Sequence, residues 1–172
     1  MNGKIGTAMV VAGSLLAIAL VARSGPAAPP LEAAARVNLA YTIEDMSGAT
    51  VDLATFAGKP LLINLWATWC GPCRLEMPQL DALSVKFKDC GLVVIGISAD
   101  DKPDAIRAIA SEYKISYRML VGLGQDALLR ELGYEDVLPY SILVRADGTV
   151  TDRITGLETT EDWERRITAL LR

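Results

Sequence analysis

The sequence predicts one mixed α/β domain with a short segment in front of it. Two nearly continuous apolar runs, Leu61 to Trp66 and Leu92 to Ile97, have the length and composition of strands buried on both faces of a sheet. Stretches with apolar residues at helical spacing lie between and after these runs. The chain has 172 residues, of which 51% are hydrophobic, so it can form one compact domain and an appendage, whereas two full domains would be crowded.

A hairpin is expected at the start of the domain. Residues Asn38 to Ile43 and Thr50 to Leu53 alternate loosely between apolar and polar, and Ser47-Gly48 between them is a turn sequence. The strand from Leu61 to Trp66 then follows a Gly-Lys-Pro sequence, which is typical of a loop. The first buried strand therefore comes directly after the hairpin.

Helices and strands alternate through the rest of the domain. After Cys70, three leucines and Phe87 have helical spacing, and this pattern stops near Gly91. The later elements are expected in this order after the strand that ends at Ile97: a helix over Asp104 to Tyr113, a strand over Tyr117 to Val121, a helix over Gln125 to Leu132, a hairpin of Tyr140 to Val144 and Val150 to Ile154 around Asp147-Gly148, and a closing helix over Thr160 to Leu171.

The first 23 residues are typical of a membrane anchor or an export signal. No charged side chain interrupts the run from Ile5 to Ala22, and this length is close to the minimum of about 17 residues that can span a bilayer. A cleaved signal peptide would instead require small residues in an A-x-A pattern just beyond the apolar core. Because Ala17 and Ala19 lie inside that core, an uncleaved anchor is favoured, with a cleaved signal as the alternative.

Residues 24–36 have the composition of a linker, because they are rich in small residues and proline and show no apolar periodicity. The folded domain is therefore expected over residues 37–172. The amino terminus and Lys4 before the apolar run, against Arg23 after it, weakly favour a domain outside the cytoplasm. We expect the cell inner membrane, with the domain on the periplasmic side, and a cleaved periplasmic form is the alternative.

Charge and histidine content restrict the chemistry. The net charge is −4 and no run of lysines and arginines is present, so the sequence offers no footprint for nucleic acid. Histidine, the commonest general base and transition-metal ligand, is absent from the whole chain. Any reaction must therefore use thiols and carboxylates.

Cys70 and Cys73 are the residues in the chain best suited to chemistry. Two cysteines separated by two residues at the start of a helix can form a small disulfide ring, and the helix dipole lowers the pKa of the first thiol. Cys70 is expected to attack a substrate disulfide, and Cys73 to resolve the mixed disulfide. Pro72 is tolerated because its missing N–H would have no helical partner at that position. A structural disulfide would not explain the flanking Trp69 and Gly71.

Half of a zinc site is the other alternative for this pair. Zinc requires about four ligands, and three cysteines without histidine would have to rely on carboxylates. We therefore expect neither a metal nor a cofactor other than the redox-active pair itself. Cys90 has no CxxC partner and begins a predicted strand. We expect a small packed residue or an incidental thiol, with intermolecular pairing as the alternative.

The segment around the two cysteines resembles a known family. The run Trp69 to Cys73 resembles the thioredoxin active-site motif, and the following Arg74-Leu75-Glu76-Met77-Pro78 resembles the TlpA/ResA-like branch of exported thiol–disulfide oxidoreductases. The resemblance extends from about Val37 to the end of the chain. It implies a thioredoxin-like fold: a central mixed sheet flanked by helices, with an N-terminal hairpin and a strand–helix insertion in the middle of the domain.

The resemblance also implies roles for residues outside the cysteine pair. The family's cis-proline loop would fall at Leu138-Pro139, whose backbone would pair with an extended substrate peptide beside Trp69, Gly71 and Pro72. Thioredoxin has an aspartate at the position of Asn64, which cannot take a proton. The family's alternative is Glu76, which would tune thiol acidity, whereas a solvated helix carboxylate is the reading without the resemblance. Trp66 and Trp163 are expected to be packing residues.

The predicted function is that of an enzyme. The resemblance implies a membrane-anchored oxidoreductase that reduces disulfides in exported client proteins, of the cytochrome c maturation or cytochrome oxidase assembly type. Its partners would be those proteins, the membrane and a membrane thiol–disulfide electron donor. A copper carrier that uses the two thiols is one alternative, although Met77 is a weak further ligand. A thioredoxin-fold peroxidase is the other, although the separate peroxidatic motif is absent.

Overall fold

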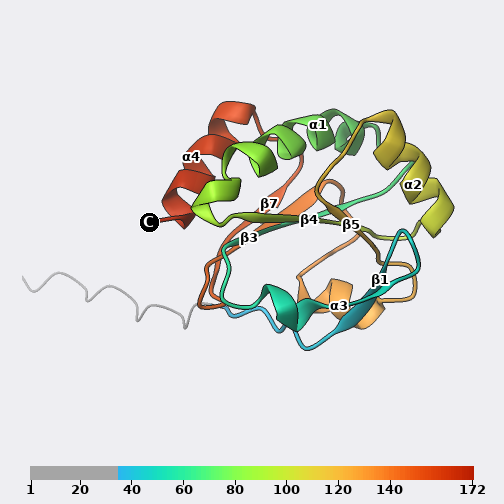
Figure 1. The fold of residues 1–172 in the computed structure, drawn as a ribbon, viewed down its shortest axis with the longest axis horizontal. Helices are drawn as coiled ribbons and strands as arrows, with labels where there is room; N and C mark the ends of the chain where they lie inside the picture. The colour runs from blue at the N-terminus through green and yellow to red at the C-terminus, as the bar shows by residue number, and fades with distance from the viewer. Residues whose placement is uncertain (1–34) are drawn as a thin grey trace, which may run out of the picture. The chain divides into compact units, whose positions relative to one another are not determined.

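The computed structural model describes residues 35–172, so the expected anchor over residues 1–23 and nearly all of the linker lie outside the described residues. Within the described part, no helix has both the length and the apolar composition needed to cross a membrane. A seven-stranded mixed sheet has the order β2-β1-β5-β4-β3-β6-β7 (Figure 1). Its strands are β1 (Thr42–Asp45), β2 (Thr50–Asp52), β3 (Leu61–Trp66), β4 (Val93–Ser98), β5 (Arg118–Val121), β6 (Tyr140–Val144) and β7 (Val150–Thr155).

The helices lie on both sides of this sheet. On one side are α1 (Gly71–Lys86), α2 (Pro103–Glu112) and α4 (Thr160–Leu170), and on the other is the short α3 (Asp126–Glu131) (Figure 1). Two 3-10 helices, η1 (Leu53–Phe56) and η2 (Lys88–Cys90), connect neighbouring elements. This is the thioredoxin-like fold with the expected N-terminal hairpin, β1–β2, and the inserted strand and helix in the middle of the domain.

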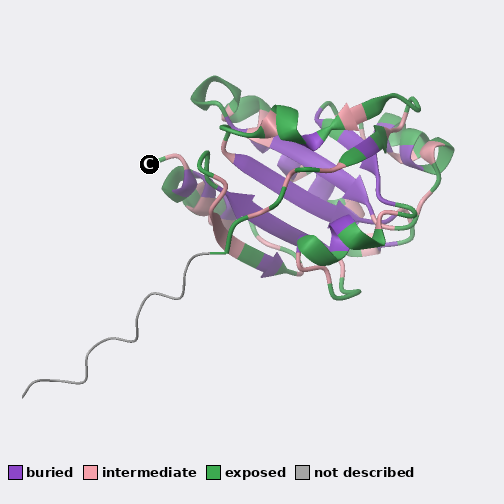
Figure 2. Ribbon diagram, turned by 90° about the horizontal axis from the view of Figure 1, so that it is seen from below, coloured by how far each residue is buried: buried purple, intermediate pink, exposed green. Residues whose placement is uncertain are grey.

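The central strand β3 determines where loops gather at the ends of the sheet. It runs parallel to β4, which runs parallel to β5, and it is antiparallel to β6. The carboxyl ends of β3, β4 and β5 therefore lie at one edge together with the start of β6. All six residues of β3 are buried, as its continuous apolar run predicts, and the inner strands are buried along most of their length (Figure 2).

Two predicted boundaries are wrong. The first strand begins at Thr42 instead of Asn38, because the side chain of Asn38 accepts a hydrogen bond from the Ala40 N–H at 2.9 Å and forms a local turn. Cys90 does not begin a strand and is not packed, and of the two expected roles the structure agrees with an incidental thiol. It is exposed and unpaired at the end of η2, since Gly91 adopts a left-handed conformation at φ 86° and the strand begins only at Val93.

Candidate active site

Cys70 and Cys73 form a disulfide at the N-terminus of α1, with a Cα–Cα distance of 5.3 Å. Residues 67–70, which we call the active-site turn, connect β3 to this helix, and the Cys70 N–H donates to the Ala67 carbonyl at 3.1 Å. Cys70 is the N-cap residue, and its Sγ accepts the Cys73 N–H at 3.2 Å. The first sulfur therefore lies where unpaired backbone N–H groups favour an anion.

The surroundings of the disulfide differ sharply in exposure. Cys70 and Cys73 are only 4% and 1% exposed, whereas the Trp69 side chain beside them is 65% exposed. Pro72 is also exposed, and Gly71 is partly exposed. Cys70 is thus the more accessible sulfur by a small margin, and an apolar surface residue lies next to it in the chain.

Glu76 lies in the interior, not on a solvated face of α1. It is 1% exposed, and its Oε2 accepts a hydrogen bond from the Asn64 side chain at 3.1 Å. Glu76 follows Cys73 by three residues, and positions three apart on a helix have Cβ atoms about 5–6 Å apart on one face. The reading of Glu76 as a solvated carboxylate is therefore wrong.

Burial raises the pKa of the Glu76 carboxyl from 4.5 to about 7. The Glu158 backbone and the side chains of Trp163 and Asn64 offset part of this effect because they favour the charged form. Only the Asn64 contact has the geometry of a full hydrogen bond, since Oε1 of Glu76 and Nε1 of Trp163 have no hydrogen-bond partner. Burial consequently dominates, and the group can exchange a proton near neutral pH.

A pair of polar residues on two adjacent strands is connected to Glu76 by hydrogen bonds. Asn64 on β3 lies opposite Ser141 on β6, and the Asn64 amide donates to Oγ of Ser141 at 2.9 Å as well as to Glu76. Both residues of this pair are buried. Ser141 is not evident from the sequence, because it lies in an apolar strand 77 positions from Asn64. A polar residue inside an otherwise apolar run was the only signal available.

The Leu138–Pro139 peptide bond is cis, as the family resemblance implies. Pro139 directly precedes β6, where Tyr140 pairs with Leu65 near the end of β3. The loop is therefore at the same edge of the sheet as the active-site turn. The Gly156 N–H donates to the Pro139 carbonyl at 2.8 Å and attaches this loop to the end of β7. Its role in substrate binding stays a prediction.

Two aspartates that sequence reasoning missed contact the active-site turn. Asp101 accepts hydrogen bonds from the backbone and the hydroxyl of Thr68, and Asp100 accepts from the indole N–H of Trp69. Both aspartates lie in the loop after β4, which ends at Ser98. Their position after a buried parallel strand was a usable signal, because the carboxyl ends of parallel strands lie at one edge of the sheet.

The other predicted residues are placed clearly. Trp66 and Trp163 are fully buried in the core, as expected of packing residues. Cys90 is a free, exposed thiol in η2, at the end of α1 opposite to the disulfide. Cys70, Cys73 and Glu76 lie together at the start of α1, whereas Cys90 does not belong to this site.

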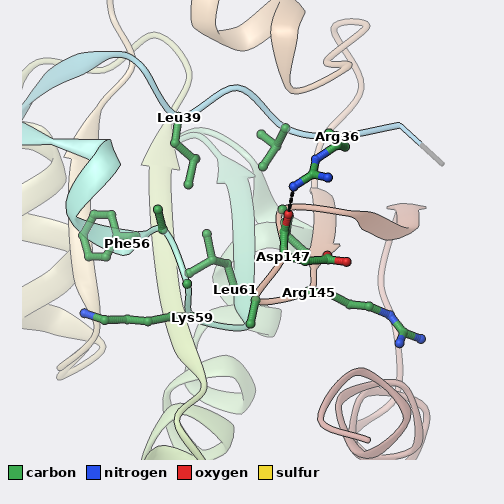
Figure 3. A pocket seen from close by; sticks show the side chains of 13 residues that line it. Arg36, Leu39, Phe56, Lys59, Leu61, Arg145 and Asp147 are labelled. Atoms are coloured by element: carbon green, nitrogen blue, oxygen red, sulfur yellow. Dashed lines mark hydrogen bonds between the residues drawn. The ribbon is translucent and has the colours of Figure 1, made fainter. Parts of the chain in front are cut away.

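A cavity of about 230 Å³ lies at the opposite edge of the sheet (Figure 3). Its lining includes Leu61 at the start of β3 and Val144 at the end of β6, whereas the disulfide follows the end of β3. The side chains of Lys59 and Arg145 extend away from it in different directions (Figure 3). Because its lining contains no cysteine, this cavity is separate from the disulfide chemistry.

Comparisons with known proteins agree with this geometry. The sequence model of the Redoxin family matches residues 24–171. The thiol-disulfide oxidoreductase ResA of Bacillus thuringiensis subsp. konkukian is 32% identical over 124 residues, covering 72% of this chain and 70% of the relative.

Two solved structures share the fold. A thiol:disulfide interchange protein of the thioredoxin family from Chlorobium tepidum has a TM-score of 0.73 at 23% identity, over 82% of this chain and 99% of the other. A secreted disulfide oxidoreductase of Mycobacterium tuberculosis has a TM-score of 0.69 at 24% identity, over 77% and 97%. With a disulfide at the helix start and a matching family, the chain belongs to the Redoxin family, as a ResA-like thiol–disulfide oxidoreductase with a thioredoxin-like fold.

Proposed function

We propose that this protein is a membrane-anchored oxidoreductase that reduces disulfides in client proteins outside the cytoplasm. The observation that carries the proposal is the Cys70–Cys73 disulfide at the N-terminus of α1, with the buried Glu76 one helical turn further along. An attacking thiol, a resolving thiol and a group that exchanges protons near pH 7 are the parts this reaction requires.

The reaction begins with the reduced pair. The Cys70 thiolate attacks one sulfur of a client disulfide, so that a Cys70–client bond forms while the client S–S bond breaks. The other client sulfur leaves as a thiolate and takes up a proton. The helix N-terminus favours the attacking Cys70 thiolate because its N–H groups and dipole are aimed at that sulfur.

Resolution completes the transfer of two electrons. Cys73 loses its proton, and its thiolate attacks Sγ of Cys70, so the Cys70–Cys73 bond forms and the Cys70–client bond breaks. The second client sulfur leaves and is protonated. The client is then reduced and the enzyme oxidised. We assign Glu76 as the acceptor of the Cys73 proton, since a carboxyl with a pKa of about 7 can both accept and return a proton at neutral pH.

Support for the cellular setting comes from the sequence. The uncharged segment from Ile5 to Ala22 has the length of an anchor, and the family resemblance favours an exported protein. We propose a membrane thiol–disulfide electron donor that reduces the pair again after each cycle. The proposed clients are proteins whose cysteines must be reduced before a metal or haem is attached, as in cytochrome c maturation or cytochrome oxidase assembly.

The test of direction is the equilibrium reduction potential of the full chain. A value near −270 mV, about that of thioredoxin, supports a reductant, whereas a value near −120 mV would mark an oxidant and overturn the direction. A Cys73→Ser variant should accumulate a mixed disulfide between Cys70 and a client protein. The matched control is Cys90→Ser, which removes the exposed thiol in η2 and should turn over like the unaltered chain. Failure of the Cys70–Cys73 disulfide to form would contradict the redox function.

A further inference from the structure

One carboxylate connects two loops at the active-site edge of the sheet. Asp101 follows β4, and its Oδ2 accepts the Thr68 N–H at 2.6 Å while its Oδ1 accepts the Thr68 hydroxyl at 2.6 Å. Oδ2 also accepts the Ser98 hydroxyl at 2.6 Å. Thr68 belongs to the active-site turn, so one carboxylate fixes both the main chain and the side chain of that turn two residues before Cys70.

A second carboxylate holds the neighbouring aromatic residue. The indole N–H of Trp69 points to both carboxylate oxygens of Asp100, at 3.0 and 3.2 Å. Trp69 is 65% exposed, so core packing does not determine its orientation. The contact with Asp100 therefore restrains a side chain that would otherwise be free to rotate at the surface.

The end of β4, from which both aspartates extend, is held firmly in the sheet. Ser98 is fully buried at the end of β4, and its carbonyl accepts the Gly122 N–H at 2.7 Å. A Cβ at Gly122 would come within 2.5 Å of that carbonyl oxygen, so only glycine allows this close approach. The Ala99 N–H also donates to the Trp66 carbonyl at 2.8 Å. The end of β4 is thus fixed to both neighbouring strands.

We propose that Asp101 and Asp100 are positioning residues that hold the active-site turn, and through it the Cys70 sulfur and the Trp69 indole, in the reactive arrangement. This inference rests on the proposed dithiol chemistry. Thiol–disulfide exchange requires the attacking sulfur to approach along the S–S axis, and small displacements of reacting groups slow reactions strongly. A site of this kind depends on neighbouring groups whose own hydrogen bonds lock it in place.

The alternative is that Asp101 only stabilises the fold, in which case Asp101→Ala lowers the urea midpoint but leaves the alkylation rate of the folded protein unchanged. In Asp101→Asn, the amide oxygen can occupy the place of Oδ2 and accept from Thr68 and Ser98, while the amide nitrogen donates to the Thr68 hydroxyl, which can reorient. Asp101→Ala removes all three hydrogen bonds. Asp104→Ala is the matched control, because Asp104 is an exposed aspartate three residues later that pairs only with Arg107.

The experiment uses the full chain with Cys90→Ser in every variant, because Cys90 is a free, exposed thiol that would also react. The reduced protein is alkylated with iodoacetamide across pH, the label on Cys70 is quantified by peptide mass spectrometry, and turnover is measured with insulin as the disulfide substrate. We expect Asp101→Ala to lower the rate constant of Cys70 alkylation and that of insulin reduction by about tenfold. Its urea midpoint is measured as well, to show that the variant is folded. Asp101→Asn should recover both rate constants to within about twofold, and Asp104→Ala should leave them unchanged.

Trp69 provides an independent spectroscopic readout. Asp100→Ala should change the emission of Trp69, measured as the difference from a Trp69→Phe variant that removes the contribution of this residue. The buried Trp66 and Trp163 provide a constant background. Unchanged emission in Asp100→Ala would mean that Asp100 does not hold the indole.

Any of three results would overturn the proposal. Asp101→Ala could be alkylated at the unaltered rate, Asp101→Asn could be alkylated as slowly as Asp101→Ala, or Asp104→Ala could lose as much alkylation rate as Asp101→Ala. Alkylation of Cys70 does not depend on any client. If insulin is not reduced while Asp101→Ala still slows alkylation, the proposed function fails and the positioning role stands. Normal turnover in every variant would leave the function intact and remove the positioning role.

Discussion

The two faces of the central sheet have cores of different character. The face covered by α1, α2 and α4 contains the disulfide. Five buried polar atoms in the described part of the chain have no hydrogen-bond partner: one is Nε of Arg166 on α4, and the other four lie in the core on the disulfide side. These four are Nε1 of Trp66, Oε1 of Glu76, the Tyr117 hydroxyl and Nε1 of Trp163. On the face covered by α3, the core is almost wholly aliphatic, and its buried Tyr140 hydroxyl donates to the Leu132 carbonyl at 3.1 Å.

This difference places the buried carboxyl on the disulfide side of the sheet. A carboxylate in an apolar core is unfavourable when it is charged, and Glu76 is the only buried carboxyl among the described residues. Burial, followed by the charge of Glu76, raises the pKa of the Tyr117 hydroxyl, which shows that the two groups share one low-dielectric core. The core of the α3 face contributes stability, and its buried residues in the described part of the chain include no carboxyl group.

The largest expected effect is on stability and comes from the α3 face. Leu65 is 1% exposed in the aliphatic core, and Leu65→Ala should lower the free energy of unfolding by about 3 kcal/mol, through lost apolar burial and the cavity left behind. Urea denaturation measures it. The reduction potential of the Cys70–Cys73 pair should stay unchanged, and a shifted potential would show that the two faces are not separable.

Glu76 should make the α1 face sensitive to pH. Its pKa of about 7 in the folded, oxidised protein exceeds the ordinary value of 4.5, so the folded state binds the proton more tightly than the unfolded state. The contribution to stability is present below about pH 4.5 and is lost as pH rises through about 7. The loss by pH 8 should reach about 3 kcal/mol, which is about 2.5 pKa units at about 1.36 kcal/mol each.

Glu76→Gln tests this assignment. The variant should remove most of that pH dependence in urea denaturation between pH 4 and 8, and it should be more stable than the unaltered protein at pH 8. It should also slow disulfide reduction by about a hundredfold if the carboxyl accepts the Cys73 proton. Glu161→Gln, on the exposed face of α4, is the control. Retention of the full pH dependence in Glu76→Gln would assign it to another group.

Asn64 should have a smaller effect of predictable sign. Its hydrogen bond lowers the pKa of Glu76, so Asn64→Leu, which removes that bond with little change in volume, should raise the midpoint of the pH-dependent stability by about one pH unit. Ser141→Ala keeps the Asn64–Glu76 bond and serves as the control. A midpoint that moves down would mean that Asn64 acts mainly by burying Glu76.

The smallest effect on stability is expected from an ion pair at the surface of the α1 face. Lys86 and Glu164 form an ion pair at 2.6 Å between α1 and α4, but their side chains are 53% and 39% exposed. Glu164→Gln should therefore change the free energy of unfolding by about 0.5 kcal/mol or less at physiological ionic strength. A larger change, measured by urea denaturation, would show that this exposed ion pair contributes more to stability than its exposure predicts.

The sequence predicted the elements whose signals are local. The bounds of β3 and β6 agree with their apolar runs, and the hairpin β6–β7 agrees with its Asp-Gly turn. The start of β1 was misplaced, because a side-chain hydrogen bond of Asn38 competes with strand pairing and leaves no trace in apolar periodicity. Cys90 was placed in a strand because its composition does not reveal a 3-10 turn.

The sequence by itself determined where the redox-active cysteine pair lies and that it can form a disulfide. Two thiols, a proline and a helix start fall within four positions, so their geometry depends only on local structure. Only the tertiary structure decided what surrounds that pair. Burial raises the pKa of Glu76, and the folded sheet places its carboxyl against Asn64, which in turn donates to Ser141 77 positions away. The contact of Asp101 with Thr68 spans 33 positions. Such contacts form only when the sheet brings its strand ends together, which no local pattern records.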